Sequence, residues 1–490
     1  MPQSRPGPEA PAGQEQPQEA NVLRQLLRSP GYLKLLCLSA LLGIPVSLAA
    51  FWFLVLIHRM ETSLWTDLPK SLGWDVPPWW WPLPLLLVGG IVVGLVVTHL
   101  RGAGGHIPAG GMQTGGASSA ALPGVIIAAA ASLPLGAVLG PEAPLIALGG
   151  GLALLLRDIA QIPATPQSTA LVGAAGAGAA IAVIFGSPLI AAVLLIEVAG
   201  VGGPQLFAVM LPALLSTGVG SLVFTGLGRW TGLHTGDLTM KVSAPVPHLD
   251  AADVGWALLI GAAVALALHP VMHGARVVAR YVLARPLVRT VQCALAAAVC
   301  ISLYALITGR NPAEAAGSGQ ETLAELTKDP GAWGVGALIA VLVFKGAAYA
   351  LCLGSMRGGP IFPALCLGGM AGVLLAPLPG LGLVPSLAAC MAATAAAAMR
   401  LPVSSVVLVV VVLGGSAMVP VVILAAVVSF VVTELLPGGP TVPAVSGARP
   451  GAPPPAPPPP PGGGGRPPPG PGGGGAPRPP RGGGGGGACG

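Results

Sequence analysis

Glu142 is the residue of this chain whose type and position most directly suggest chemistry. Between residues 76 and 236 the sequence holds only three acidic side chains, those of Glu142, Asp158 and Glu197. Glu142 lies between two prolines at the start of a glycine-rich apolar segment. The first turn of a helix offers unpaired N–H groups and a favourable dipole to an anion. We therefore expect this carboxylate either to occupy an anion site, from which a permeating anion or protonation would release it, or to cap the helix without a mechanistic role.

A second helix start resembles the first but carries no acid. Residues 358–363 are Gly-Gly-Pro-Ile-Phe-Pro. Glycines before a helix let backbone amides approach a ligand closely. Because proline has no N–H to donate, the expected donors are the N–H groups of Ile361 and Phe362. The same pattern also marks ordinary helix starts.

Three other ionisable positions are notable, and two of them have both a functional and a structural interpretation. Glu197 follows the apolar run 188–196, so it is a candidate for a proton pathway or an end-of-helix carboxylate that reaches the membrane surface. His106 could titrate at a pore entrance or be a solvated loop residue. Asp158 follows Arg157 at the end of an apolar run, and we expect an interfacial ion pair without a function.

The composition excludes an ordinary water-soluble enzyme. Apolar residues make up 53% of the 490 residues and charged residues 8%, against about a quarter charged in a soluble domain. The net charge of +6 is spread along the chain without a basic stripe, so no nucleic-acid partner is expected. The seven cysteines include no pair at CxxC spacing, and the apolar stretches hold no His/Asp/Glu cluster. We therefore expect neither a metal centre nor a cofactor, and no enzymatic activity.

Apolar segments must position the candidate residues. A hydrocarbon core of roughly 30 Å requires about 20 helical residues. Segments of that length are 32–57, 79–100, 205–227, 251–273, 291–308, 332–354 and 403–433. Shorter or interrupted segments are 123–139, 144–156, 170–184, 188–199, 363–376 and 384–398. Helices that end inside a bilayer need protein or a water-filled cavity around their ends, so the sequence predicts an all-α, polytopic membrane protein with tilted and broken helices around an internal pathway.

Three motifs recur in the same order in each half of the chain: a glycine cluster, a Gly/Pro helix start and a later Pro helix start. They lie at 102–105, 140–144 and 185–189 in the first half and at 317–319, 358–363 and 399–403 in the second. This order predicts two inverted repeats, about 79–227 and 251–433, within a membrane domain of residues 31–437.

Charge placement predicts the orientation. Basic residues at 24–34 precede the first span, and residues 276–289 contain four arginines and no acid. Because cytoplasmic loops are enriched in Lys and Arg, we expect both segments and both termini in the cytoplasm of a plasma-membrane protein. The N-terminal residues 1–30 should be partly disordered. The Pro/Gly-rich tail, 438–490, should be disordered and form no folded regulatory domain.

Taken together, these motifs resemble those of the CLC family of chloride channels and chloride/proton antiporters, in its bacterial type. The resemblance spans about residues 31–437. Segment 140–144 is similar to the family's Gly-Arg-Glu-Gly-Pro element, and segment 185–197 to its Phe-Asn-Ala-Pro-Leu helix that ends in acids. Segment 359–363 resembles the Gly-x-Phe-x-Pro element, and segment 400–402 the later Arg-x-Pro helix start.

The resemblance implies a homodimer in membrane lipid, with a separate pathway in each subunit for chloride or a similar small anion and, in antiporters, for protons. Glu142 would be the external gate, and Glu197 would match the first of two acids that end the family's Phe-Asn-Ala-Pro-Leu helix. The residues expected at the anion site are Gly104, Gly105, His106, Ile107, Pro108, Gly140, Pro141, Ala143, Gly359, Pro360, Ile361 and Phe362.

The chain also departs from the family pattern. The family's anion-binding serine falls on Gly105, and the late tyrosine that closes the inner mouth has no counterpart after Glu434. The second acid falls on Val198, which favours a channel with a glutamate gate, voltage- or pH-dependent, over an antiporter; both hypotheses stay open. A hypothesis from another class is a cation-coupled transporter of an organic solute, which would also use broken helices and inverted repeats.

Overall fold

The computed structural model describes residues 24–25, 27–111, 118–199, 203–233 and 249–442. They all belong to the first of two compact units, Met1–Arg449. The predictions for most of the N-terminal segment and for the tail from residue 443 fall outside this described part. Within it every regular element is a helix, apart from a bridge between Gly140 and Gly359. The predicted all-α class is thereby confirmed.

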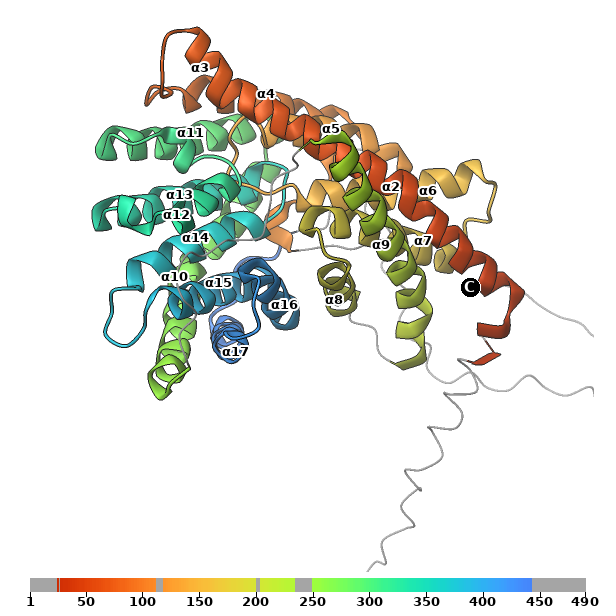
Figure 1. The fold of residues 1–490 in the computed structure, drawn as a ribbon. Coiled ribbons are helices and arrows are strands. Elements are labelled where there is room, and N and C mark those ends of the chain that lie inside the picture. The colour runs from red at the N-terminus through yellow and green to blue at the C-terminus, as the bar shows by residue number, and fades with distance from the viewer. Residues whose placement is uncertain (1–23, 26, 112–117, 200–202, 234–248, 443–490) are drawn as a thin grey trace, which may run out of the picture. The chain divides into compact units, whose positions relative to one another are not determined.

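The helices fall into two series along the chain (Figure 1). The first comprises α2 (Pro30–Thr62), α3 (Leu68–Ser71), α4 (Pro82–His99), α5 (Leu122–Ser132), α6 (Glu142–Ile159), α7 (Pro166–Phe185), α8 (Pro188–Ala199) and α9 (Gly203–Thr231). The second comprises α10 (Ala251–Leu283), α11 (Pro286–Thr308), α12 (Gln320–Lys328), α13 (Val335–Ser355), α14 (Ile361–Leu375), α15 (Leu383–Met399), α16 (Pro402–Leu413) and α17 (Val419–Leu435). Short helical turns, η1 to η6, lie at Ser63–Asp67, Arg101–Gly104, Pro108–Gly110, Ser119–Ala121, Pro312–Glu314 and Pro330–Ala332.

Proline and glycine set many of these bounds. Proline occupies the first turn of helices such as α2, α7, α11 and α16, where its missing N–H has no partner to lose. Gly186, Gly309 and Gly414 follow α7, α11 and α16 with φ of 61°, 68° and 68°, a left-handed conformation that a side chain would strain. These local rules explain why so many apolar helices end abruptly.

Seven helices among the described residues are long and apolar enough to cross a membrane. They are Pro30–Ser71, Pro82–His99, Ser168–Phe185, Ala208–Thr231, Ala251–Leu283, Pro286–Thr308 and Val335–Ser355. Two expectations about length were wrong. The segment 170–184 belongs to the 20-residue α7, because a Thr165 cap and Pro166 start the helix earlier. The run 403–433 is broken into α16 and α17, because Gly414 ends α16.

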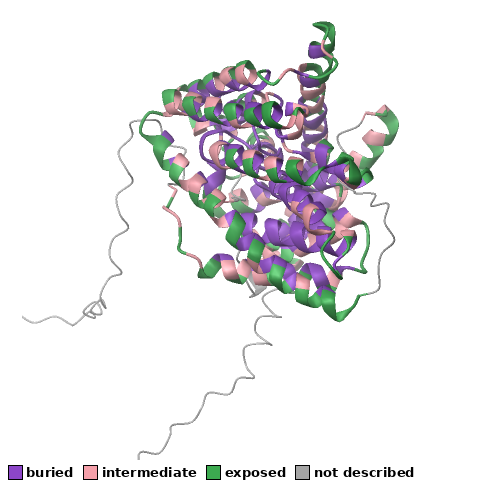
Figure 2. Ribbon diagram, turned by 90° about the vertical axis from the view of Figure 1, so that its left-hand side faces the viewer, coloured by how far each residue is buried: buried purple, intermediate pink, exposed green. Residues whose placement is uncertain are grey.

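The faces of the helices divide into a packed interior and an apolar exterior. Figure 2 shows buried positions gathered between the helices and exposed positions on their outer faces. Several outer side chains are large and apolar, for example Leu222, which is 75% exposed, and Ile307, which is 64% exposed. A soluble protein rarely exposes many such side chains together. Lipid is therefore the medium that suits this exterior.

The two halves use the same sequence of elements. In each, a short helix that starts at a Gly/Pro motif (α6, α14) packs on the following apolar helix (α7, α15). A short Pro-initiated helix comes next (α8, α16), and α8 packs against α16. Close approach of the backbones accompanies this packing: a Cβ placed on Gly149 of α6 would lie 2.4 Å from the carbonyl oxygen of Gly176 in α7. Small residues thus allow α6 and α7 to meet, as in other membrane helix pairs.

Candidate functional site

The starts of α6 and α14 meet inside the protein. The N–H of Gly140 donates to the carbonyl of Gly359 at 2.8 Å, and the N–H of Gly359 donates to the carbonyl of Gly140 at 2.6 Å. This reciprocal pair of hydrogen bonds joins Gly140 and Gly359, which lie 219 residues apart in the sequence. The Gly/Pro motifs that the sequence singled out in the two halves are therefore neighbours.

Glu142 crosses from one helix start to the other. Its Oε1 accepts a hydrogen bond from the backbone N–H of Phe362, at 2.8 Å, in the first turn of α14. Its Oε2 is buried and has no hydrogen-bond partner, and the residue as a whole is 0% exposed. No lysine or arginine in the described ranges forms an ion pair with it. A buried carboxylate in this state is stabilised mainly by the amide and the helix dipole, and one of its oxygens remains unsatisfied.

Two glycines leave the space that the carboxyl group fills. A Cβ on Gly359 would lie 1.8 Å from Oε2 of Glu142, and a Cβ on Gly140 would lie 2.2 Å from the same atom. Such distances are far below van der Waals contact. The glycines of both motifs therefore serve the site itself, and any larger residue would expel the carboxyl group.

Two aromatic residues hold the α14 start in place. The hydroxyl of Tyr349, on α13, donates to the carbonyl of Pro360 at 2.6 Å, and Tyr349 is fully buried. The ring of Phe185, at the end of α7, stacks on Phe362 with centroids 5.7 Å apart. Sequence analysis missed Tyr349. Its only local signal is that a buried tyrosine in an apolar helix needs a partner for its hydroxyl.

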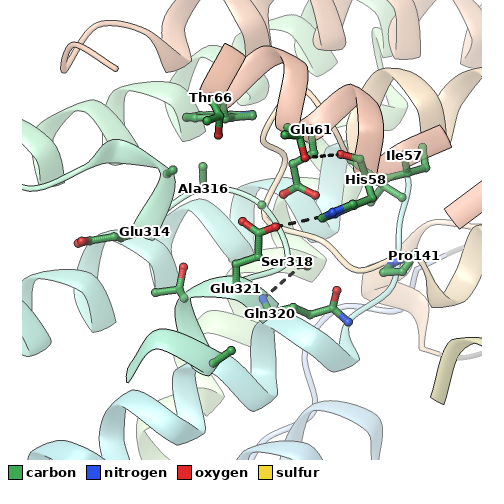
Figure 3. A pocket seen from close by; sticks show the side chains of 18 of the residues that line it. Ile57, His58, Glu61, Thr66, Pro141, Glu314, Ala316, Ser318, Gln320 and Glu321 are labelled. Atoms are coloured by element: carbon green, nitrogen blue, oxygen red, sulfur yellow. Dashed lines mark hydrogen bonds and ion pairs between the residues drawn. The ribbon is translucent and has the colours of Figure 1, made fainter. Parts of the chain in front are cut away.

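A cavity of about 480 Å³ reaches the chain segment just before Glu142 (Figure 3). Leu139 and Pro141, which precede Glu142, form part of its wall. Its other lining residues include Glu61, Glu321 and His58, and His58 Nδ1 lies 3.8 Å from Glu321 Oε1. Glu61 lies in the last turn of α2 and was not among the residues that sequence analysis singled out. The cavity therefore extends as far as the residues that directly precede and follow Gly140.

The loop 104–108 lies against a different residue, Arg357. Nε of Arg357 donates to the carbonyl of Ala103 at 3.1 Å, and its Cγ lies 3.5 Å from the position of a Cβ on Gly104. Partial burial and the neighbouring guanidinium lower the pKa of His106 to about 4, so its imidazole is neutral at neutral pH. Between the described residues of this loop and Glu142 there is no hydrogen bond. The structure thus gathers Gly140, Gly359 and Phe362 around the carboxyl group, and the loop 104–108 around Arg357.

Glu197 caps the N-terminus of α16. Its Oε1 accepts from the N–H of Val403 at 3.0 Å, and its Oε2 accepts from the N–H and the hydroxyl of Ser404 at 2.7 and 2.6 Å. These three hydrogen bonds cap α16, a role that sequence analysis did not predict for Glu197. The ion pair expected between Arg157 and Asp158 is present, with a distance of 2.6 Å.

Broken helices whose starts meet inside an apolar, many-span bundle are typical of membrane transport proteins. The sequence model of the voltage-gated chloride channel family matches residues 107–434. The chain therefore belongs to this family, the CLC family.

Individual relatives agree with this assignment. A relative named ion-transport protein YfeO, from Escherichia fergusonii, is 30% identical over 154 residues, which are 31% of this chain and 36% of that protein. The match thus spans about a third of that relative's length. A slow cyanobacterial Cl⁻/H⁺ antiporter has the same fold, with a TM-score of 0.68, 18% identity and coverage of 83% of this chain and 96% of that one. A CLC-type fluoride/proton antiporter gives a TM-score of 0.62 at 18% identity, covering 82% and 96%.

Proposed function

We propose that the protein moves chloride across a membrane through a pathway inside each chain, with the carboxyl group of Glu142 as the gate. The observation that carries this proposal is the hydrogen bond from the N–H of Phe362 to Glu142 Oε1. The amide that holds the carboxylate is one that could hold a halide ion. Gate and anion therefore compete for one place.

The energetics suit an ion that must also leave. Half-helix starts present partial positive charges and N–H groups, which replace part of the hydration shell of a chloride ion. No lysine or arginine among the described residues pairs with Glu142, so a full opposite charge does not hold the ion there. Binding of this kind is weak enough to permit release.

The unsatisfied Oε2 supports a gate that moves. A buried oxygen without a partner costs free energy, on the order of 1–3 kcal/mol, and rotation of the carboxyl group toward the cavity at Pro141 would hydrate it. Protonation would remove the charge that the Phe362 amide attracts. Either event leaves the site to chloride.

Channel and antiporter mechanisms differ in what accompanies the anion. We favour a channel because Val198 stands where the family's second acid is expected and because Glu197 is engaged at α16. The structurally similar proteins named above are antiporters, so proton coupling is the competing hypothesis. As a family member the protein would act as a homodimer in the plasma membrane, with its arginine-rich end in the cytoplasm.

Purified protein in liposomes separates these mechanisms. Chloride efflux is recorded with a chloride electrode under a valinomycin clamp, and proton movement is recorded at the same time. A channel gives chloride efflux without proton movement. A fixed ratio of protons to chloride would instead establish an antiporter, and uptake of labelled amino acids or sugars without chloride flux would overturn the anion assignment.

A further inference from the structure

Arg357 is a buried cation that no acid neutralises. It lies between α13 and α14 and is 4% exposed. Its Nε donates to the carbonyl of Ala103 at 3.1 Å, and its Nη1 donates to the carbonyl of Met356 at 3.2 Å. A guanidinium has five N–H donors, and Nη2 has no hydrogen-bond partner among the described residues. No carboxylate there forms an ion pair with Arg357.

Other buried cations of the described chain are accommodated differently. Arg157 is 5% exposed and pairs with Asp158 at 2.6 Å. The ammonium group of Lys345 is fully buried, and its three donors face the carbonyls of Glu314, Ala316 and Gly317 at 3.4, 2.8 and 3.4 Å. Burying a charge without a counter-charge is costly. Arg357 therefore lacks a counter-charge. The carbonyl groups of Ala103 and Met356 compensate for it only in part.

The backbone beside Arg357 also has free donors. Residues 102–105 all have positive φ, from 47° to 99°. The N–H groups of His106 and Ile107 donate to no other described residue. Because the imidazole of His106 is neutral, the positive charge at this place comes from Arg357.

The site faces the arginine-rich end of the protein. α13 begins near Trp333, whose ring stacks on Arg310, and the next residue, Asn311, lines the acidic cavity. The 21 residues of α13 extend about 31 Å away from that end. Near its other end, the position of a Cβ on Gly354 lies 2.6 Å from the carbonyl of Ala275 in α10, the residue before Arg276. Arg357 thus lies toward the side opposite the cavity lined by Glu61 and Glu321.

We propose that Arg357 is an anion-binding residue: its guanidinium, with the N–H groups of residues 106 and 107, holds a monovalent inorganic anion on the arginine-rich side of the pathway. This inference rests on the proposed chloride transport and adds a fully charged side chain to it. The mobile anion supplies the counter-charge that no side chain provides. Chloride would occupy this site before it replaces the carboxyl group of Glu142 at the Phe362 amide.

Chloride titration of the purified full-length protein, by calorimetry in detergent, tests the proposal. With Glu142 intact, its carboxylate fills the site at Phe362, so the titration reports binding elsewhere. We expect Arg357→Gln to weaken chloride binding roughly tenfold or more, because a hydrogen bond to a charged donor is lost. Arg157→Gln is the matched control: it removes a guanidinium that is equally buried but already paired, and chloride binding should not change.

A second measurement tests the proposal even if Arg357→Gln folds poorly. Chloride bound to the folded state raises the thermal unfolding midpoint, so the shift between chloride-free and chloride-containing buffer is recorded for wild type and for Arg357→Lys, which keeps the charge but loses the planar fork. The shift should be smaller in Arg357→Lys. Equal chloride binding in wild type and Arg357→Gln, or equal loss in Arg157→Gln, overturns the proposal. If the wild-type protein transports chloride in liposomes but Arg357→Gln binds chloride unchanged, only this inference is contradicted. If the wild-type protein transports no chloride, the proposed function is contradicted.

Discussion

Glu142 combines two properties that rarely occur together. One carboxylate oxygen is held by a backbone amide at 2.8 Å, and the other is buried without a partner. The first property fixes the group in the anion site, and the second keeps the free energy of that state high enough for the group to leave. A side chain that only capped α6 would have no reason to reach the first turn of α14. The cap interpretation from the sequence is therefore the less economical of the two.

Gly359→Ala probes the space that the carboxyl group needs. Its Cβ would lie 1.8 Å from Glu142 Oε2, so we expect the folded state to be destabilised by roughly 1–3 kcal/mol, as for overpacking of a core. In a Glu142→Ala background the nearest side-chain atom left is the Cβ of residue 142, at 3.0 Å. The penalty should then shrink, and a double-mutant cycle of thermal unfolding in detergent measures the difference.

Gly346→Ala in α13 is the control for this cycle. Its new Cβ would meet nothing closer than Val271 Cγ2 at 3.9 Å. Because alanine favours helix over glycine, unfolding should move little or toward higher temperature. Equal penalties for Gly359→Ala with and without the Glu142 carboxyl group would show that the two residues do not share the space inferred for them.

At the scale of elements, local chemistry and long-range contacts divide what the sequence can predict. Gly/Pro helix starts and left-handed glycines act within a few residues, so the broken helices and the donor role of the Phe362 amide could be predicted. Contacts such as Arg357 to Ala103, 254 residues apart, or Glu197 to Ser404, 207 apart, depend on how helices pack. No local pattern specifies them. Tyr349 and Arg357 escaped sequence analysis for that reason.

Glu197→Ala tests whether α16 depends on its cap. Three hydrogen bonds to Val403 and Ser404 would be lost, and we expect a destabilisation of about 1–2 kcal/mol, the usual cost of losing an N-cap. Glu197→Gln keeps one acceptor oxygen and should lose less. Thermal unfolding gives the free-energy change, and proton movement in liposomes should stay as in wild type. Normal unfolding combined with altered proton movement would instead place Glu197 in a proton pathway.

At the scale of the whole described unit, charge is divided between two ends. α11 begins after Arg285 and ends before Asn311, which lines the cavity with Glu61 and Glu321. Its 23 residues extend about 34 Å, roughly the thickness of a hydrocarbon core. The acidic cavity and the arginine-rich segment 276–289 therefore lie on opposite sides of a bilayer. From the positive-inside rule we expect the arginines in the cytoplasm and the cavity outside.

Cysteine labelling tests this orientation. In a chain whose Cys37 and Cys489 are replaced by serine, Ser71→Cys and Ala284→Cys each add one exposed thiol, at the cavity end and the arginine-rich end respectively. An impermeant maleimide should label Ser71→Cys in intact cells and Ala284→Cys only after permeabilisation. The reverse pattern would invert the assigned orientation.

The gate at Glu142 is tested most directly by the pH dependence of chloride efflux from liposomes that contain wild type or Glu142→Gln. Acid should protonate the wild-type carboxyl group and weaken its hold on the Phe362 amide, so wild-type efflux should rise as the pH falls. Glu142→Gln mimics the protonated state, and its efflux should be high and independent of pH. Identical efflux from both proteins at neutral and acidic pH would contradict the account.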